Sequence, residues 1–170
     1  GVYAFGKQRY RRGGIWYTAT SGIWQTVWLE SVPENYIKNI RLTPDFDEKC
    51  LLWHIDADAP AGAHVTVRAA GEVIAAGRAD ENGDGVSVVP AECFHPWLPE
   101  DPYLYDVEIT LGDDRVTSYF GMRKFSTVEH KGRRVLALNN EPYFQTGLLD
   151  QGYWSDGLYT PPSDVAMIYD

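Results

Sequence analysis

The sequence predicts an all-β protein built around an antiparallel β-sandwich. Three observations lead to this prediction. Apolar and polar residues alternate along several short runs, which is the period of a half-buried strand. Clusters of Gly, Pro, Asn and Asp separate these runs, as turns do. Helical spacing is found only near the C-terminal end, so we expect strands to supply the core.

The central segment, residues 34–125, holds about seven strand-like runs. The clearest are 50–57, 65–69 and 103–111, in which every second residue is apolar. Seven short strands separated by turns are typical of an immunoglobulin-like sandwich, here without the Cys–Trp–Cys pattern of antibody domains. The side chains expected in the interior are Leu51, Trp53, Ile55, Val65, Val67, Val86, Val88, Tyr105, Val107 and Ile109.

The segments on either side of the sandwich are interpreted as partial flanking elements. Before it, residues 15–18 and 24–29 are strand-like but too short to form a domain alone. After it, a hairpin is expected over 134–146, with its turn at 139–142. Near the end, Ser163 follows two prolines as an N-cap, and apolar residues at 165, 168 and 169 begin a helical stripe. We therefore expect a truncated C-terminal strand, loop and helix.

Composition excludes several classes of function. Lys and Arg total 15 against 24 Asp and Glu, and a net charge of −9 disfavours a nucleic-acid binder. The sequence contains no long apolar run of the kind that crosses a membrane, so no membrane partner is expected. The two ends differ in charge, with four cations among the first 12 residues and only acids after Arg134.

No cofactor or metal site is predicted. Cys50 and Cys93 are interpreted as two ordinary thiols rather than a disulfide, and no Cys/His zinc spacing occurs. The four histidines fall on separate elements. The run Asn82-Gly83-Asp84-Gly85 lacks the ligand ladder of a calcium loop, so we interpret it as a tight hairpin turn.

Four segments, in order along the chain, resemble glycoside hydrolases of family 2. TSGIWQTVWLE at 20–30 is similar to the closing strands of that family's sugar-binding jelly roll. WLPEDPYLYDV at 97–107 and FGMRK at 120–124 resemble its immunoglobulin-like domain. LLDQGYWSDGLY at 148–159 resembles the first strand and loop of its catalytic (β/α)₈ barrel.

The resemblance implies a domain order. Residues 1–33 would be trailing strands of the jelly roll, 34–125 the whole sandwich, and 126–170 a hairpin with the first strand, loop and helix start of the barrel. A barrel needs about 250 residues, so this segment cannot contain one. In the family both catalytic glutamates lie on later barrel strands. We therefore expect no catalytic residue here and no hydrolysis by the chain alone. Glu141, in an Asn-Glu-Pro string, is interpreted as a turn residue.

The aromatic loop after residue 149 is the best candidate for contact with substrate, because barrel enzymes build active sites at such loops. Its aromatic rings and carboxylates suit sugar faces and hydroxyls, although they suit packing and turn capping equally well. The residues expected near substrate in a full-length relative are Asp150, Gln151, Tyr153, Trp154 and Asp156.

Three classes of function remain open. The first is a non-catalytic β-sandwich segment of a family 2 glycosidase of β-galactosidase or β-glucuronidase type. Its partners would be the rest of the glycosidase chain and a carbohydrate. The second is a free-standing carbohydrate-binding module, and the third is an adhesion-type sandwich that binds protein. Self-association through unpaired flanking strands is also expected. The compartment, cytoplasmic or secreted and periplasmic, stays open, with a bacterial source expected.

Overall fold

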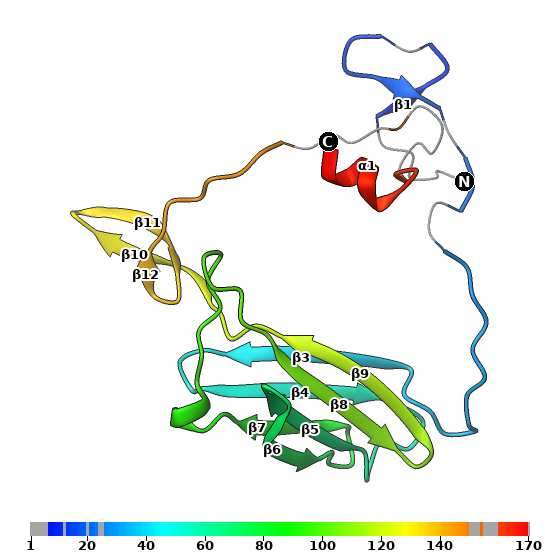
Figure 1. Ribbon diagram of the computed structural model, residues 1–170, viewed down its shortest axis with the longest axis vertical. Coiled ribbons are helices and arrows are strands. Elements are labelled where there is room, and N and C mark those ends of the chain that lie inside the picture. Colours follow the sequence, from blue (N-terminus) through cyan, green and yellow to red (C-terminus); the bar gives the residue numbers. More distant parts are fainter. Residues whose placement is uncertain are drawn as a thin grey trace. The chain divides into compact units, whose positions relative to one another are not determined.

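The computed structural model describes residues 7–11, 13–19, 21–23, 26–149, 154 and 160–169 (Figure 1). The chain forms two compact units, one of residues 31–147 and one that combines 1–30 with 148–170. Each unit is described by itself.

The larger unit contains the predicted sandwich, with seven strands in two antiparallel sheets. One sheet has the order β3-β4-β7 and the other the order β6-β5-β8-β9 (Figure 1). A short 3₁₀ helix, η1 (Ala91–Cys93), follows β7. The strands are β3 (Asn39–Asp45), β4 (Cys50–Asp56), β5 (His64–Ala69), β6 (Glu72–Arg78), β7 (Asp84–Val88), β8 (Tyr105–Leu111) and β9 (Asp114–Phe120).

The core lies between the two sheets and follows the predicted alternation on β4, β5 and β8. Every residue predicted to be interior on these three strands is buried. They are Leu51, Trp53, Ile55, Val65, Val67, Tyr105, Val107 and Ile109. Because successive side chains of a strand point to opposite faces, the register of these three strands is the predicted one.

The prediction for β7 is wrong by one residue. Val86 and Val88 are 52% and 65% exposed, whereas Ser87 and Val89 are buried. The reason is the indole of Trp53, whose Nε1 donates a hydrogen bond to Ser87 Oγ at 3.1 Å. A Cβ atom added to Gly85 would lie 2.1 Å from the Trp53 ring. The inward positions of β7 are therefore small because the tryptophan fills the space beside them.

The run 82–85 is a turn, but not the predicted hairpin, because β6 and β7 belong to different sheets. Asp80 Oδ1 accepts hydrogen bonds from the amides of Asn82 and Asp84 at 2.8 and 2.9 Å. The carbonyl oxygen of Gly83 accepts from the Ile55 amide. Gly83 has φ +87°, and a Cβ there would lie 2.2 Å from the Ile55 carbonyl oxygen, so only glycine fits. The turn thus carries the chain from one sheet to the other.

A separate three-stranded sheet, the hairpin sheet, follows the sandwich: β10 (Phe125–His130), β11 (Arg133–Leu138) and β12 (Glu141–Pro142), in that order. The expected hairpin is present but shorter than predicted: β11 pairs with β12 next to the turn, and the Tyr143 amide donates to the Leu136 carbonyl, whereas 144–146 form no strand. Along its other edge β11 pairs over its whole length with β10. The expected four-residue turn is reduced to Asn139 and Asn140, with φ 53° and 69°. Residues 143–149, here called the tail segment, form no strand.

The smaller unit has little regular structure among its described residues. Strands β1 (Gln8–Arg9) and β2 (Tyr17–Thr18) pair in parallel, so the strand expected over 15–18 is shorter than predicted. Residues 26–29 form no strand, and 24–25 lie outside the described residues. Helix α1 (Asp164–Tyr169) begins as predicted, with Ser163 Oγ accepting from the Ala166 amide at 3.1 Å. Among the described residues, none of the helices is long and apolar enough to cross a membrane.

Candidate functional site

The residues predicted to lie near substrate are mostly not placed. Asp150, Gln151, Tyr153 and Asp156 lie outside the described residues. Trp154 is described and is half-buried. The role of this loop therefore stays a prediction.

Glu141 is the exposed first residue of β12, opposite Leu138. It follows the two-residue turn instead of lying within it, because β12 already begins at Glu141. Glycoside hydrolysis needs two carboxyl groups held a few ångströms apart in a shaped site. An exposed strand end gives Glu141 no such setting.

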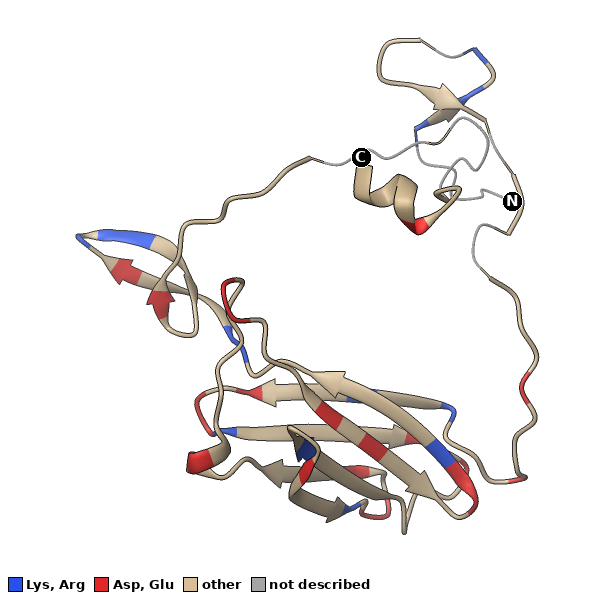
Figure 2. Cartoon of the chain, viewed as in Figure 1, with Lys and Arg blue, Asp and Glu red and all other residues tan. Residues whose placement is uncertain are grey.

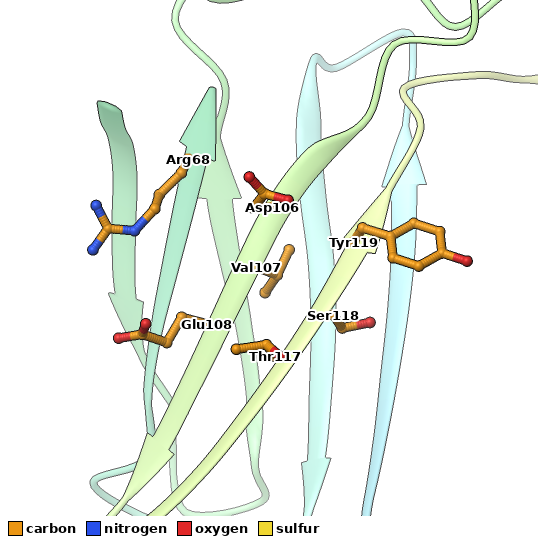
Figure 3. A pocket seen from close by; sticks show the side chains of 7 residues that line it. All are labelled: Arg68, Asp106, Val107, Glu108, Thr117, Ser118 and Tyr119. Carbon is orange, nitrogen blue, oxygen red and sulfur yellow. The ribbon is translucent and has the colours of Figure 1, made fainter. Parts of the chain in front are cut away.

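The outer face of sheet β6-β5-β8-β9 carries a depression of about 540 Å³ (Figure 3). Cross-strand pairing sets Arg68, Asp106 and Tyr119 in one row. Glu108 and Thr117 follow in the next row. Figure 3 shows the Arg68 and Tyr119 side chains extending to opposite sides. Arg115 forms an ion pair with Glu108, and Arg68 Nη1 donates to the Gly71 carbonyl at 3.3 Å. These groups diverge over an open sheet face and do not converge on one ligand atom.

Charge is also spread rather than concentrated. Figure 2 shows acidic and basic residues interspersed along the sheets of the larger unit. Within the described part of the chain, there is no group of three or more His, Cys, Asp or Glu side chains arranged to hold a metal ion. Cys50 is buried and Cys93 is half-buried, both as free thiols.

The best-organised polar cluster joins the sandwich to the hairpin sheet. We call it the joint and define it as Asp47, Trp97, Lys124, Asn139 and Asn140. The Asn139 amide donates to the Lys124 carbonyl at 2.8 Å, and Asn139 Oδ1 accepts from the Lys124 amide at 2.9 Å. Asn139 Nδ2 donates to the Trp97 carbonyl at 3.0 Å. The bonds with Lys124 extend the pairing of β10 with β11, and the bond to Trp97 connects that sheet to the segment between β7 and β8.

Charged groups strengthen the joint at its exposed side. Lys124 Nζ forms an ion pair with Asp47, and Asn140 Nδ2 donates to Asp47 Oδ1 at 2.8 Å. The hydrogen bond from Lys124, followed by the one from Asn140, lowers the pKa of the Asp47 carboxyl. Nearby, Tyr143 Oη donates to Glu100 Oε1 at 2.8 Å, and this bond raises the pKa of the tyrosine. The first residue after β12 is thus also tied to the sandwich.

Packing supports the same joint. Trp97 donates its amide to the Met122 carbonyl at 2.9 Å, and the Arg123 guanidinium lies 4.6 Å from the centre of the Trp97 ring. A Cβ added to Gly121 would lie 2.9 Å from that ring, so the glycine allows the indole to lie close to the backbone. In the same connection between β7 and β8, the Cys93 carbonyl accepts a hydrogen bond from Tyr105 Oη at 2.7 Å, and the His95 amide donates to this hydroxyl at 2.6 Å.

The joint cannot be recognised from the sequence pattern. Asn139 and Asn140 have the signature of turn residues, and their partners Lys124 and Asp47 lie 15 and 93 positions away. The one available signal was the pair of adjacent asparagines, where a hairpin turn would favour Asn-Gly.

The fold and this joint define a β-sandwich domain that holds a second β element at a fixed place. The family model described as glycosyl hydrolases family 2 matches residues 35–123, which run from just before β3 to just after β9. The match spans more than half of the 170 residues, and the chain belongs to this family.

Solved structures agree with this assignment. A β-D-glucuronidase of Dictyoglomus thermophilum is 24% identical, with a TM-score of 0.55, over 68% of this chain and 19% of its own. The β-glucuronidase of Ruminococcus gnavus is 20% identical, with a TM-score of 0.56; the match covers 68% of this chain and 20% of that protein. The β-glucuronidase of Faecalibacterium prausnitzii is 26% identical, with a TM-score of 0.53; the match covers 65% of this chain and 17% of that protein. The chain therefore spans about a fifth of the length of these proteins. No curated protein matches it.

Proposed function

We propose that this chain acts as the non-catalytic central part of a longer family 2 glycosidase. In that protein, residues 1–33 contribute trailing strands to a sugar-binding jelly roll, and 34–125 form the linking sandwich. Residues 126–170 begin the catalytic (β/α)₈ barrel. The partners of the sandwich are then the two neighbouring domains, and carbohydrate is bound by the assembled enzyme.

The observation that carries this proposal is the joint. A free-standing binding module needs a ligand surface, whereas the most developed polar cluster here joins the sandwich to the hairpin sheet that follows it. A linking domain requires such a contact, because catalytic groups must be held within a fraction of an ångström by rigid supports. The open depression on the outer sheet face offers no comparable convergence of groups.

The neighbours named above support one substrate class, because all three are described as β-glucuronidases. We therefore favour a β-glucuronide over a β-galactoside as the substrate of the complete enzyme. In that enzyme Asp150, Gln151, Tyr153, Trp154 and Asp156 would lie near the sugar, on the loop that leaves the first barrel strand.

The experiment is an activity assay on the 170-residue chain with chromogenic β-glucuronide and β-galactoside. We expect no release above buffer, because no pair of catalytic carboxyl groups is supplied. A Glu141→Gln variant is the matched control and should be equally inert. Release by the unchanged chain that disappears in Glu141→Gln would overturn the proposal, because it would make Glu141 a catalytic residue.

A further inference from the structure

Asn139 differs from its neighbour Asn140 in what its side chain does. Both residues have positive φ, 53° and 69°, as a two-residue hairpin turn of type I′ requires. Glycine serves such positions as well or better, so the turn itself needs neither side chain. The Asn140 side chain makes one exposed hydrogen bond, to Asp47. The Asn139 side chain makes two part-buried ones, to the Lys124 amide and the Trp97 carbonyl.

The two part-buried bonds connect different pieces of backbone. Lys124 lies in the link that leaves β9 for β10, and Trp97 lies in the long connection between β7 and β8. Asn139 itself lies between β11 and β12. Lys124 precedes Phe125 and Asn139 follows Leu138, and these two residues are paired, so the bonds between Lys124 and Asn139 extend the β10–β11 ladder and belong to the hairpin sheet. The bond from Asn139 Nδ2 to the Trp97 carbonyl leaves that sheet for the connection between β7 and β8. A rotation of the hairpin sheet relative to this connection would break the Trp97 bond, while the Lys124 bonds hold Asn139 in place to make it.

The remaining contacts of the joint are weaker restraints. The ion pair of Lys124 with Asp47 and the bond from Tyr143 to Glu100 are solvent-exposed. Exposed pairs between flexible side chains contribute little and are screened by salt. Partly buried bonds to backbone groups are costly to lose, because the backbone amide or carbonyl is left without a partner.

We propose that Asn139 is a positioning residue that fixes the hairpin sheet on the sandwich and so sets the direction in which the chain leaves at Tyr143. The consequence for a catalytic barrel rests on the proposed function. The geometry itself concerns only residues 31–147, which form one compact unit. Without the Asn139 side chain, the sandwich and the hairpin sheet keep their own folds but lose their common orientation.

The test uses the 170-residue chain and three variants. Asn139→Gly removes both side-chain bonds and keeps the turn. Asn139→Asp keeps an oxygen to accept from the Lys124 amide but loses the donor to Trp97. Asn140→Gly is the matched control, because it removes an adjacent asparagine side chain from the same turn. Two quantities are measured by NMR: hydrogen exchange of the Lys124 amide, and residual dipolar couplings of the sandwich and of the hairpin sheet.

In the unchanged chain and in Asn140→Gly, one alignment tensor should fit both parts. In Asn139→Gly, exchange of the Lys124 amide should rise about tenfold, the effect of losing one net hydrogen bond. The couplings of the two parts should then require different tensors. In Asn139→Asp the Lys124 amide should stay protected.

The proposal would be overturned if one alignment tensor still fitted both parts in Asn139→Gly. It would also be overturned if the two parts of Asn140→Gly needed tensors that differ as much as those of Asn139→Gly. Should Asn139→Gly fail to fold, Asn139→Asp still decides: a tensor that splits in this variant supports the proposal, and one that stays common overturns it. No glycosidase activity enters this measurement. Failure of the proposed function therefore leaves the result unchanged, and failure here leaves the activity assay unchanged.

Discussion

The sandwich and the tail segment both carry large apolar residues but differ in structure. In β8, Tyr105, Val107 and Ile109 alternate with polar residues and are fully buried between two sheets. In the tail segment, Phe144, Leu148 and Leu149 are equally apolar, yet they are 87%, 99% and 84% exposed. The tail segment has no paired strand within the described residues. Strand-forming residues become a strand only where a neighbouring strand and a facing layer are present.

The largest effect expected from this difference concerns Trp53 and Leu149. Trp53→Ala should lower the free energy of unfolding by about 3–5 kcal/mol, because it empties a packed interior and leaves Ser87 Oγ without its donor. Leu149→Ala, in the exposed tail segment, should change it by less than about 0.5 kcal/mol. Urea denaturation of both variants measures the contrast. Equal effects would mean that the tail segment is packed in solution.

Two Gly→Ala substitutions compare the packed sandwich with the exposed tail segment by adding a single methyl group to each. Gly85→Ala would place a Cβ 2.1 Å from the Trp53 ring, so the ring or β7 must shift. Overpacking of this kind typically costs about 1–3 kcal/mol. Gly147→Ala is the control, because a Cβ there meets no atom within 4 Å. The same denaturation experiment applies. If Gly85→Ala were neutral, the placement of Trp53 against β7 would be wrong.

A smaller effect is expected from the pH dependence of the joint. The pKa of Asp47 is lowered in the folded chain, mainly by its bond from Lys124. A carboxyl group with a lowered folded pKa contributes stability above its unfolded pKa of about 3.9 and loses this contribution as pH falls through the folded value. Asp47→Asn should therefore be less stable than the unchanged chain at pH 7, and the gap should close in acid. A gap that is constant with pH would contradict this assignment.

The smallest effect concerns self-association. Exposed apolar side chains of the tail segment and of α1, such as Phe144, Leu148 and Ile168, favour contacts between copies at high concentration. Light scattering should show an average mass that rises with concentration. The double substitution Phe144→Ser and Leu148→Ser should reduce this rise. A clean monomer at about millimolar concentration, with both flanks resistant to protease, would exclude such contacts.

The sequence predicts the buried positions correctly where the alternation of apolar and polar residues alone decides which face of a strand is buried. Alternation identified the sandwich and the buried faces of β4, β5 and β8, because burial on one face imposes a period of two. It failed on β7, where the volume of Trp53 decides which face can hold only small residues. A pattern within one strand holds no information about a large side chain on the next. The joint was missed for a similar reason, because its bonds connect residues up to 93 positions apart.

Amide hydrogen exchange followed residue by residue tests most directly whether the presence of neighbouring strands, and not apolar content, separates the two regions. Strands β3 to β9 and the hairpin sheet should be protected, with the highest protection at central strands such as β8. Amides 144–149 should exchange at the rate of an unstructured peptide, and the Tyr143 amide, which donates to the Leu136 carbonyl at 3.0 Å, should mark the boundary. Protection of 144–149 comparable to that of β8, in a monomeric sample, would contradict this account.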